Sequence, residues 1–392
     1  MTSKIRLRRF CLMLSYCGKQ YSGMQRNPGA TTIEECLLKA LRDSDFITDE
    51  HYARPQLIYF QRAARTDKHV SAIRQIVSLK IKESIKDQLD AVNNHLPADI
   101  RLMGAKRVTG SFDAKNFCDA RTYSYLMPSF ALCPLSEVTK ESYKVTPEVL
   151  KLFNETLKGY EGTHVFHNFT QGKKFKDDSA ARVIRFMNCS EPFYPCNQNE
   201  LEFVVVRVKG QSFMMHQIRK MIGLAIAVMK GFATEEHIRK SMEAPYMDIP
   251  KAPGLGLMLE EVHFDTYNRK FGGDGHHEPI EWEAQNDAIE NFKNEHIYPV
   301  VVETELKEKS MLTWLQTLAL HSYGTNSACL PDKSDLQTIL ASNKTIHDTN
   351  EDAGEETNTA DDDCHAKKRV KLETSETTEQ ISDSKMTGEQ IA

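Results

Sequence analysis

Segments with strand-like and helix-like patterns alternate along the first 324 residues, and this alternation limits the chain to a mixed α+β fold. In the first part, β-rich or alternating apolar patterns predict strands at 7–16, 73–81, 101–108 and 121–127. Thr31 and Thr32, followed by Glu35, form a capping pattern for an amphipathic helix over 33–41.

The second part repeats this element order. Thr146 is placed to cap a helix that has Pro147 at its first position and an apolar stripe to Tyr160. Strands at 182–189, 201–209 and 257–264 and a long helix over 213–229 follow. We therefore predict an α+β fold with two pseudo-twofold-related domains, residues 1–128 and 129–324. Each should have a mainly antiparallel sheet flanked by helices, with a cleft between the two.

Residues 325–392 have a different composition from the rest of the chain. They contain 15 Asp and Glu against 7 Lys and Arg, so the remaining 324 residues carry 43 basic and 40 acidic side chains. A tail this polar cannot bury enough apolar surface to offset its ordering entropy, and we expect disorder. The body is mildly basic, as a protein that binds RNA through patches can be.

Short basic and apolar runs bear on location. The run Lys367-Lys368-Arg369-Val370-Lys371 fits a nuclear-localisation signal, and a solvated charge cluster is the alternative. The longest apolar run, 221–229, is too short to span a bilayer, so we expect no membrane partner. No secretory signal follows the N-terminal basic residues, and strand-like sequence from Leu7 argues against a cleaved mitochondrial presequence. We expect a nuclear protein, with the mitochondrion left open as a second compartment.

The nine cysteines include no CxxC pair and no paired Cys/His spacing. We therefore expect thiols in a reducing compartment and no bound metal of the zinc-module type. None of the usual phosphate-cradling loops occurs either, so we expect no nucleotide cofactor.

A polar loop over 61–72 precedes the apolar strand 73–81, and loops supported in this way often hold functional side chains. Asp67 lies in this loop with Arg62, Arg65 and Lys68, whose charges would keep the carboxylate ionised as a nucleophile or base. A solvent-facing cluster of ion pairs is the alternative.

The segment Phe60-Gln61-Arg62-Ala63-Ala64-Arg65-Thr66-Asp67 resembles the signature of the TruA-type tRNA pseudouridine synthases. Residues 10–316 are similar to the eukaryotic branch of that family. The supporting motifs occur in the family's order at 21–25, 118–125, 162–169, 209–223 and 251–257. This order, over about three-quarters of the chain, makes chance similarity an inadequate explanation.

The resemblance implies that the chain isomerises uridine to pseudouridine in tRNA, with mRNA and small nuclear RNA left open as further substrates. It implies that Asp67 is catalytic, that Arg65 helps open the RNA and anchors the carboxylate, that Tyr123 stacks on the target base, and that Leu257 packs against it. The reaction is a redox-neutral isomerisation and needs no cofactor. The sequence leaves the oligomeric state open, and we expect a monomer.

The helix over 213–229 has an apolar face typical of a core helix. Arg219 and Lys220 flank that face and could reach phosphate or anchor the catalytic loop. His216 is equally consistent with a core histidine and with an RNA contact.

The sequence departs from the family pattern at His69, where the family has glycine. Glycine there indicates a left-handed backbone, which histidine adopts at a cost of order 1 kcal/mol. This departure supports the main alternative, a catalytically silent RNA-binding protein on the same scaffold. A plain RNA-recognition module lacks its aromatic-rich strand here, and a glycosidase-like hydrolase would need a second carboxylate opposite Asp67.

Overall fold

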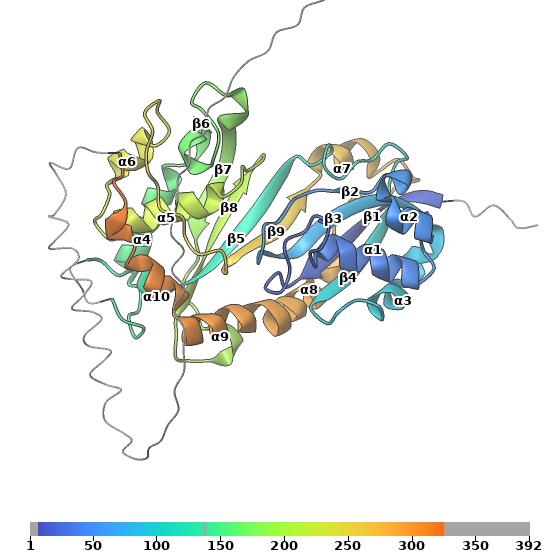
Figure 1. The fold of residues 1–392 in the computed structure, drawn as a ribbon, viewed down its shortest axis with the longest axis horizontal. Helices are drawn as coiled ribbons and strands as arrows, with labels where there is room; N and C mark the ends of the chain where they lie inside the picture. Colours follow the sequence, from blue (N-terminus) through green and yellow to red (C-terminus); the bar gives the residue numbers. More distant parts are fainter. Residues whose placement is uncertain (1–6, 136, 138, 325–392) are drawn as a thin grey trace, which may run out of the picture. The chain divides into compact units, whose positions relative to one another are not determined.

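The computed structural model describes residues 7–135, 137 and 139–324, which lie in one compact unit. Its centre is one nine-stranded sheet (Figure 1). The strands are β1 (Leu7–Tyr16), β2 (Gln61–Arg62), β3 (Ser71–Lys82), β4 (Ile100–Arg107), β5 (Ala120–Pro128), β6 (Gly162–Val165), β7 (Ala181–Cys189), β8 (Phe203–Gly210) and β9 (Leu257–His263).

The strand order is β4-β1-β3-β9-β5-β8-β7-β6, with β2 paired to β3 at one side. Every pairing is antiparallel except that of β3 with β9. This parallel ladder is short, with Ser71 opposite Met258 and Ala72 opposite Leu259, and it joins the two halves of the sheet. The predicted mainly antiparallel α+β class is confirmed, but the expected pair of sheets is one continuous sheet, because β9 pairs with β3 on one side and with β5 on the other.

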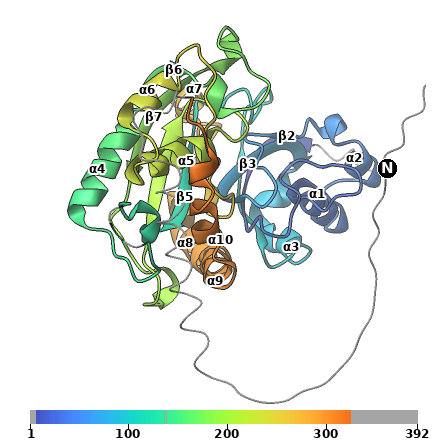
Figure 2. The ribbon, with the colours of Figure 1, turned by 60° about the vertical axis from the view of Figure 1, so that its left-hand side comes forward.

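Helices cover both halves of the sheet (Figures 1 and 2). The first half carries α1 (Ile33–Asp43), α2 (Asp49–Ala53) and α3 (Leu89–Asn93), and the second carries α4 (Pro147–Lys158), α5 (Gln217–Met229) and α6 (Glu235–Lys240). The two predicted caps are confirmed, since the Thr32 side chain accepts from the Glu35 amide and that of Thr146 from the Val149 amide. The remaining helices are α7 (Asp265–Phe271), α8 (Asn286–Phe292), α9 (Tyr298–Glu308) and α10 (Ser310–Leu315).

The segment α8–α9 connects the two halves (Figure 1). Helix α8 contacts β3, and Arg74 on that strand donates to Asn286 Oδ1 at 3.1 Å. Helix α9 contacts the short 3-10 helix Pro195–Asn197, and its Thr304 hydroxyl accepts from Lys19 Nζ at 2.7 Å. These contacts hold the two halves together at a site distant in sequence from the β3–β9 ladder.

One predicted helix differs in its start. The apolar pattern predicts a helix from residue 213, whereas α5 begins at Gln217, because His216 has φ 65° and so leaves the helical region. The boundary at 128 between the proposed domains stays a prediction. Strand β5, which comes directly before this boundary, pairs with the later strands β8 and β9. The predicted disorder of 325–392 and the basic run 367–371 lie outside the described residues.

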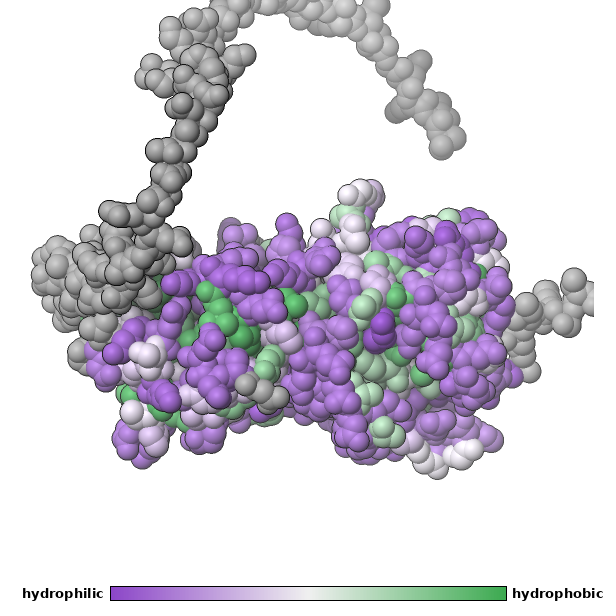
Figure 3. Space-filling model, turned by 90° about the horizontal axis from the view of Figure 1, so that it is seen from below, coloured by the Kyte–Doolittle hydropathy of each residue, from purple (hydrophilic) through white to green (hydrophobic). Residues whose placement is uncertain are grey.

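The surface view in Figure 3 is mainly hydrophilic, with apolar side chains in small separate patches. Among the described residues, no helix is both long enough and apolar enough to cross a bilayer.

Candidate active site

A cavity of about 610 Å³ lies where the two halves of the sheet meet. Two segments form its walls. The loop wall (residues 61–70) contributes 61–67 and Val70, and the helix wall (residues 212–219) contributes all of its residues. Tyr123 from β5 and Leu257 from β9 complete the lining, together with Lys115 and Arg121. The cavity therefore brings together Asp67, Arg65, Tyr123, Leu257 and Arg219.

The loop wall is fixed from beneath by a buried polar network. The fully buried Gln75 of β3 accepts from the Ala64 amide at 3.2 Å and donates to the Ala64 carbonyl at 2.9 Å. Tyr16 of β1 hydrogen-bonds to Thr66 Oγ1 at 2.8 Å, and burial raises its pKa to about 12. Backbone groups and side chains on both sides of Arg65 are thus tied to the sheet, which holds Asp67 at a defined place.

A second segment packs against the loop wall backbone to backbone. The Met24 amide donates to the Thr66 carbonyl, and Gly23 has φ 98°. A Cβ at Gly18 would lie 2.2 Å from the Val70 carbonyl oxygen, so only glycine fits there. This close packing places the motif at 21–25 directly against the loop that carries Asp67.

His69 has φ 66°, which confirms the left-handed backbone predicted at this position. The turn is closed by the Val70 amide, which donates to the Asp67 carbonyl at 3.2 Å. The imidazole Nδ1 of His69 hydrogen-bonds to the Lys19 carbonyl at 2.5 Å. The histidine therefore replaces glycine in the same backbone conformation and adds one contact of its own.

Arg121 is a site residue to which the sequence assigned no role. Its Nε donates to the Ala63 carbonyl at 3.0 Å and its Nη1 to the Gln211 carbonyl at 3.2 Å. It thus links the loop wall to the residue directly before the helix wall. The signal that could have identified it is its position in the motif 118–125, two residues before Tyr123.

The helix wall turns sharply before α5. His216 has φ 65° at the N-cap of the helix, and the buried Gln217 accepts from the Met214 amide at 2.9 Å through Oε1. Burial and the charge of Lys251 lower the pKa of His216, against the opposing charge of Asp67. The imidazole forms part of the cavity lining and has no hydrogen-bond partner among the described residues.

Arg219 is anchored to the segment that leads into β9. Its Nε donates to the Ala252 carbonyl at 2.7 Å, and its guanidinium carbon lies 3.4 Å from the ideal Cβ position of Gly254. Burial lowers the pKa of Arg219, while the charges of Tyr125 and Asp67 act to raise it. Asp67 and Arg219 therefore line the same cavity from opposite walls, and no ion pair within 4.0 Å joins them in the described part of the chain.

Tyr123 and Leu257 form an apolar floor and are 8% and 7% exposed. The Tyr123 ring contacts Phe213 edge to face, with centroids 5.4 Å apart and planes at 85°. Burial raises the pKa of Tyr123 well above its usual range, so the phenol is neutral. A neutral aromatic ring that lines a cavity is suited to stacking on a planar base.

The cations around Asp67 differ from those expected. Arg62 lines the cavity but forms its ion pair with Glu34, at 2.9 Å, and Arg65 is exposed without a partner among the described residues. Lys220 does not line the cavity, since it donates to the Asn168 carbonyl at 2.9 Å. Of Arg219 and Lys220, Arg219 is therefore the one that lines the cavity on the wall opposite Asp67.

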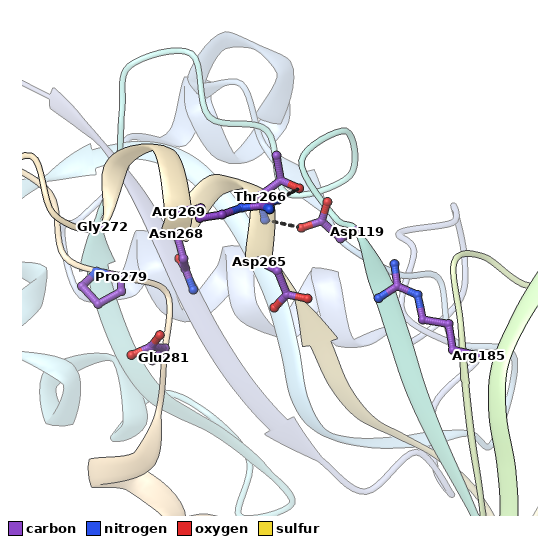
Figure 4. A pocket seen from close by; sticks show the side chains of 9 residues that line it. All are labelled: Asp119, Arg185, Asp265, Thr266, Asn268, Arg269, Gly272, Pro279 and Glu281. Atoms are coloured by element: carbon purple, nitrogen blue, oxygen red, sulfur yellow. Dashed lines mark hydrogen bonds between the residues drawn. The ribbon is translucent and has the colours of Figure 1, made fainter.

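A second cavity, of about 780 Å³, lies beside α7 (Figure 4). Its charged groups have structural partners: Asp119 Oδ2 accepts from the Thr266 amide at 2.8 Å, and Arg269 donates to Thr266 Oγ1 at 3.4 Å. Both signs of charge are present, with Asp265 and Arg185 among the lining residues. The bond from Thr266 to Asp119 attaches α7 to the segment before β5, and none of the predicted site residues lines this cavity.

Within the described ranges, no three His, Cys, Asp or Glu side chains are grouped in a way that could hold a metal ion. The Asp67 cavity itself combines a carboxylate and several basic side chains with the apolar surface of Tyr123 and Leu257.

Comparison with known proteins identifies relatives over most of the chain. Residues 157–265, which include the helix wall, match the family model described as tRNA pseudouridine synthase. The chain is 49% identical to the mouse (Mus musculus) pseudouridylate synthase 1 homolog, over 82% of this chain and 76% of the relative. It is 50% identical to the human (Homo sapiens) homolog over 81% and 74%. It is 32% identical to tRNA pseudouridine synthase 1 of Yarrowia lipolytica over 76% and 71%.

Proposed function

The chain belongs to the tRNA pseudouridine synthase family, and from that premise we propose that Asp67 is the carboxylate with which it isomerises uridine to pseudouridine in tRNA. The single observation that carries this assignment is the placement of Asp67 in one cavity with Tyr123, Leu257 and Arg219. These residues come from opposite halves of the sheet and are distant in sequence.

The reaction breaks the bond between uracil N1 and ribose C1′ and forms a bond from C5 to C1′, while a proton leaves C5 and N1 gains one. The base must first leave its stack, and a pocket with an aromatic floor lowers the cost of that step. A cavity of about 610 Å³ has room for one flipped nucleotide. Tyr123 then stacks on the base, and Leu257 limits its movement.

Asp67 acts on the flipped nucleotide as a nucleophile or base. Attack at C1′, attack at C6 of uracil and a glycal route all require the carboxylate beside the same ribose and base, so the proposal is common to the three. Arg219 orients the carboxylate from the opposite wall, and Arg65 at the exposed side of the cavity contacts the RNA backbone. A catalytically silent protein would not need this constellation, and nothing in the comparisons favours it.

The test compares Asp67→Ala and Asp67→Asn with the wild-type chain on a tRNA transcript. We expect both variants to lose pseudouridine formation and to keep nearly full tRNA affinity, because phosphate contacts supply most of the binding free energy. Asp119→Asn, in the second cavity, is the matched control and should retain activity. A variant at Asp67 with more than a small fraction of wild-type turnover would contradict the assignment.

We also propose a nuclear location, supported by the basic run 367–371 in the sequence. Deletion of 325–392 should preserve activity in vitro and reduce nuclear accumulation of a tagged protein, and replacement of the four basic residues of the run by alanine should have the same effect on location. A truncated protein that stays equally nuclear would exclude this signal.

Two further points have their own measurements. Fractionation of the same cells tests for a mitochondrial pool. Mapping pseudouridine in mRNA and small nuclear RNA of cells that lack the protein tests for further substrates.

A further inference from the structure

The cavity can enclose one nucleotide, so the rest of a tRNA must be held on the surface outside it. A surface element suited to this task lies between β6 and β7. The Phe175 loop (residues 171–176) consists of Gln171, Gly172, Lys173, Lys174, Phe175 and Lys176, all of them exposed. It combines three lysines with one aromatic residue and contains no acidic side chain.

The loop is an ordered turn that presents Phe175 and its lysines outward. The Lys174 amide donates to Asp177 Oδ2 at 2.9 Å, and Lys173 Nζ donates to Ser179 Oγ at 2.7 Å. The first acidic side chain after the loop is thus engaged with the backbone. Lys174 Nζ and Lys176 Nζ have no partner among the described residues and are available to a ligand.

Phe175 is 38% exposed and packs against His167, with ring centroids 5.4 Å apart and planes at 78°. His167 is 7% exposed, and neither of its ring nitrogens has a hydrogen-bond partner in the part of the chain that the structure describes. Buried polar atoms without partners are rare and mark places that are not optimised for stability alone. The exposed ring of Phe175 is therefore held against a histidine whose ring nitrogens are buried without a partner among the described residues.

The base of the loop is connected to the cavity. The Asn168 carbonyl accepts from Lys220 Nζ at 2.9 Å, and Lys220 directly follows Arg219 of the helix wall. The Asn168 side chain in turn donates to the Ser241 and Pro245 carbonyls. The segment that leads into the loop is thus tied by Lys220 to α5, the helix whose first residues line the cavity.

We propose that the Phe175 loop is a second RNA contact, in which Phe175 stacks on an unpaired base of the substrate and Lys174 and Lys176 bind the adjacent phosphates. The proposal rests on the proposed function. An exposed aromatic ring between cations matches the chemistry of a single-stranded nucleotide segment, which offers base faces and phosphates together. The three positive charges complement a polyanion and give no reason to expect a neutral or basic protein partner.

The experiment measures tRNA affinity, its salt dependence and single-turnover rates for Phe175→Ala and for Lys174→Gln/Lys176→Gln. Stacking of one base predicts a loss of affinity of roughly tenfold for Phe175→Ala. The slope of the logarithm of the association constant against the logarithm of salt concentration is negative. The double lysine variant should make it shallower by between about 1.4 and 1.8, the value for two lost phosphate contacts. Pseudouridine formation at saturating enzyme should be unchanged in both, because Asp67 and its cavity are intact.

Helix α4 supplies matched controls. Leu152 is 49% exposed and lies on this helix with Lys151 and Lys158, so Leu152→Ala and Lys151→Gln/Lys158→Gln remove the same kinds of side chain elsewhere. The controls should bind tRNA like the wild type. Phe175→Leu keeps an apolar cover over His167 without an aromatic ring and should lose affinity like Phe175→Ala, even if the alanine variant melts earlier.

Equal affinity and equal salt slopes for the loop variants and the controls would overturn the proposal, as would a loss confined to the rate at saturation. These outcomes are separate from a failure of the proposed function. If the proposed function failed, the wild-type protein would form no pseudouridine, but the tRNA affinities of the loop variants and the controls could still be compared.

Discussion

The two walls of the Asp67 cavity contain the same three types of residue and use them differently. Each wall has an arginine facing the cavity, a fully buried glutamine at its base and a histidine with positive φ. In the loop wall and the strand beneath it these are Arg65, Gln75 and His69. In the helix wall they are Arg219, Gln217 and His216, and the comparison shows which wall is built for position and which for charge.

The loop wall is held by many polar contacts to the sheet, while its arginine is exposed. Gln75 contacts the Ala64 amide and carbonyl as well as the Tyr16 hydroxyl. The helix wall has fewer such contacts, but its arginine is half-buried and fixed to Ala252. We therefore expect the loop wall to fix where Asp67 lies and the helix wall to supply the charge that orients it.

The largest expected effect separates the two arginines. Arg219→Met should lower the single-turnover rate by about 100-fold. Without its orienting partner the carboxylate can shift, and a displacement of about 1 Å can reduce a rate by that factor. Arg65→Met should mainly weaken tRNA binding, because an exposed cation at the rim contributes through phosphate contact. The measurement is pseudouridine formation at saturating enzyme, together with the dissociation constant of each variant.

The melting temperature of both variants serves as the control for folding. If Arg65→Met lost the rate and Arg219→Met kept it, the carboxylate would be oriented from its own wall, as the family resemblance implies, and the division between the walls would be wrong.

A smaller effect separates the two glutamines. Gln75→Leu leaves the buried Ala64 amide and carbonyl without their partner and should lower the free energy of unfolding by about 2–4 kcal/mol. Gln217→Leu removes the bond to the Met214 amide and a weak one to the Met221 sulfur. The expected loss is about 1 kcal/mol, since Met214 is partly accessible to water. Urea unfolding of both variants measures the difference. Equal losses would mean that the loop wall is no better anchored than the helix wall.

Local sequence patterns were sufficient to predict most of the fold. The predicted strand at 7–16 has the bounds of β1, and the caps at Thr32 and Thr146 start α1 and α4 as expected. These features depend on neighbouring residues alone. The joining of two sheets into one depends on two residue pairs between β3 and β9, 187 positions apart, and no local pattern contains that information.

The site shows the same division. The resemblance pointed to Asp67, Arg65, Tyr123 and Leu257, and the helix pattern added Arg219. The structure places all five in one cavity. The helix pattern could not separate Arg219 from Lys220. Adjacent helix positions point about 100° apart, and which of them faces the cavity depends on packing. Arg121 had no assigned role, since its two acceptors are backbone carbonyls at Ala63 and Gln211, which carry no sequence signature.

The smallest expected effect concerns the two histidines with positive φ. Glycine removes the strain of this backbone region, which is worth about 0.5–1 kcal/mol. At His216 the imidazole has no hydrogen-bond partner among the described residues, so His216→Gly should raise the free energy of unfolding by that amount. At His69 the same gain is offset by loss of the bond to the Lys19 carbonyl, worth about 0.5–1.5 kcal/mol, and the net change should be close to zero.

Thermal and urea unfolding of the two glycine variants would measure this difference. His69→Asn, which tolerates the same φ with a shorter side chain, isolates the contribution of the bond. A clear stabilisation by His69→Gly would show that the histidine contributes nothing but strain, whereas a loss beyond 1 kcal/mol, combined with reduced pseudouridine formation, would make its side chain part of what positions Asp67.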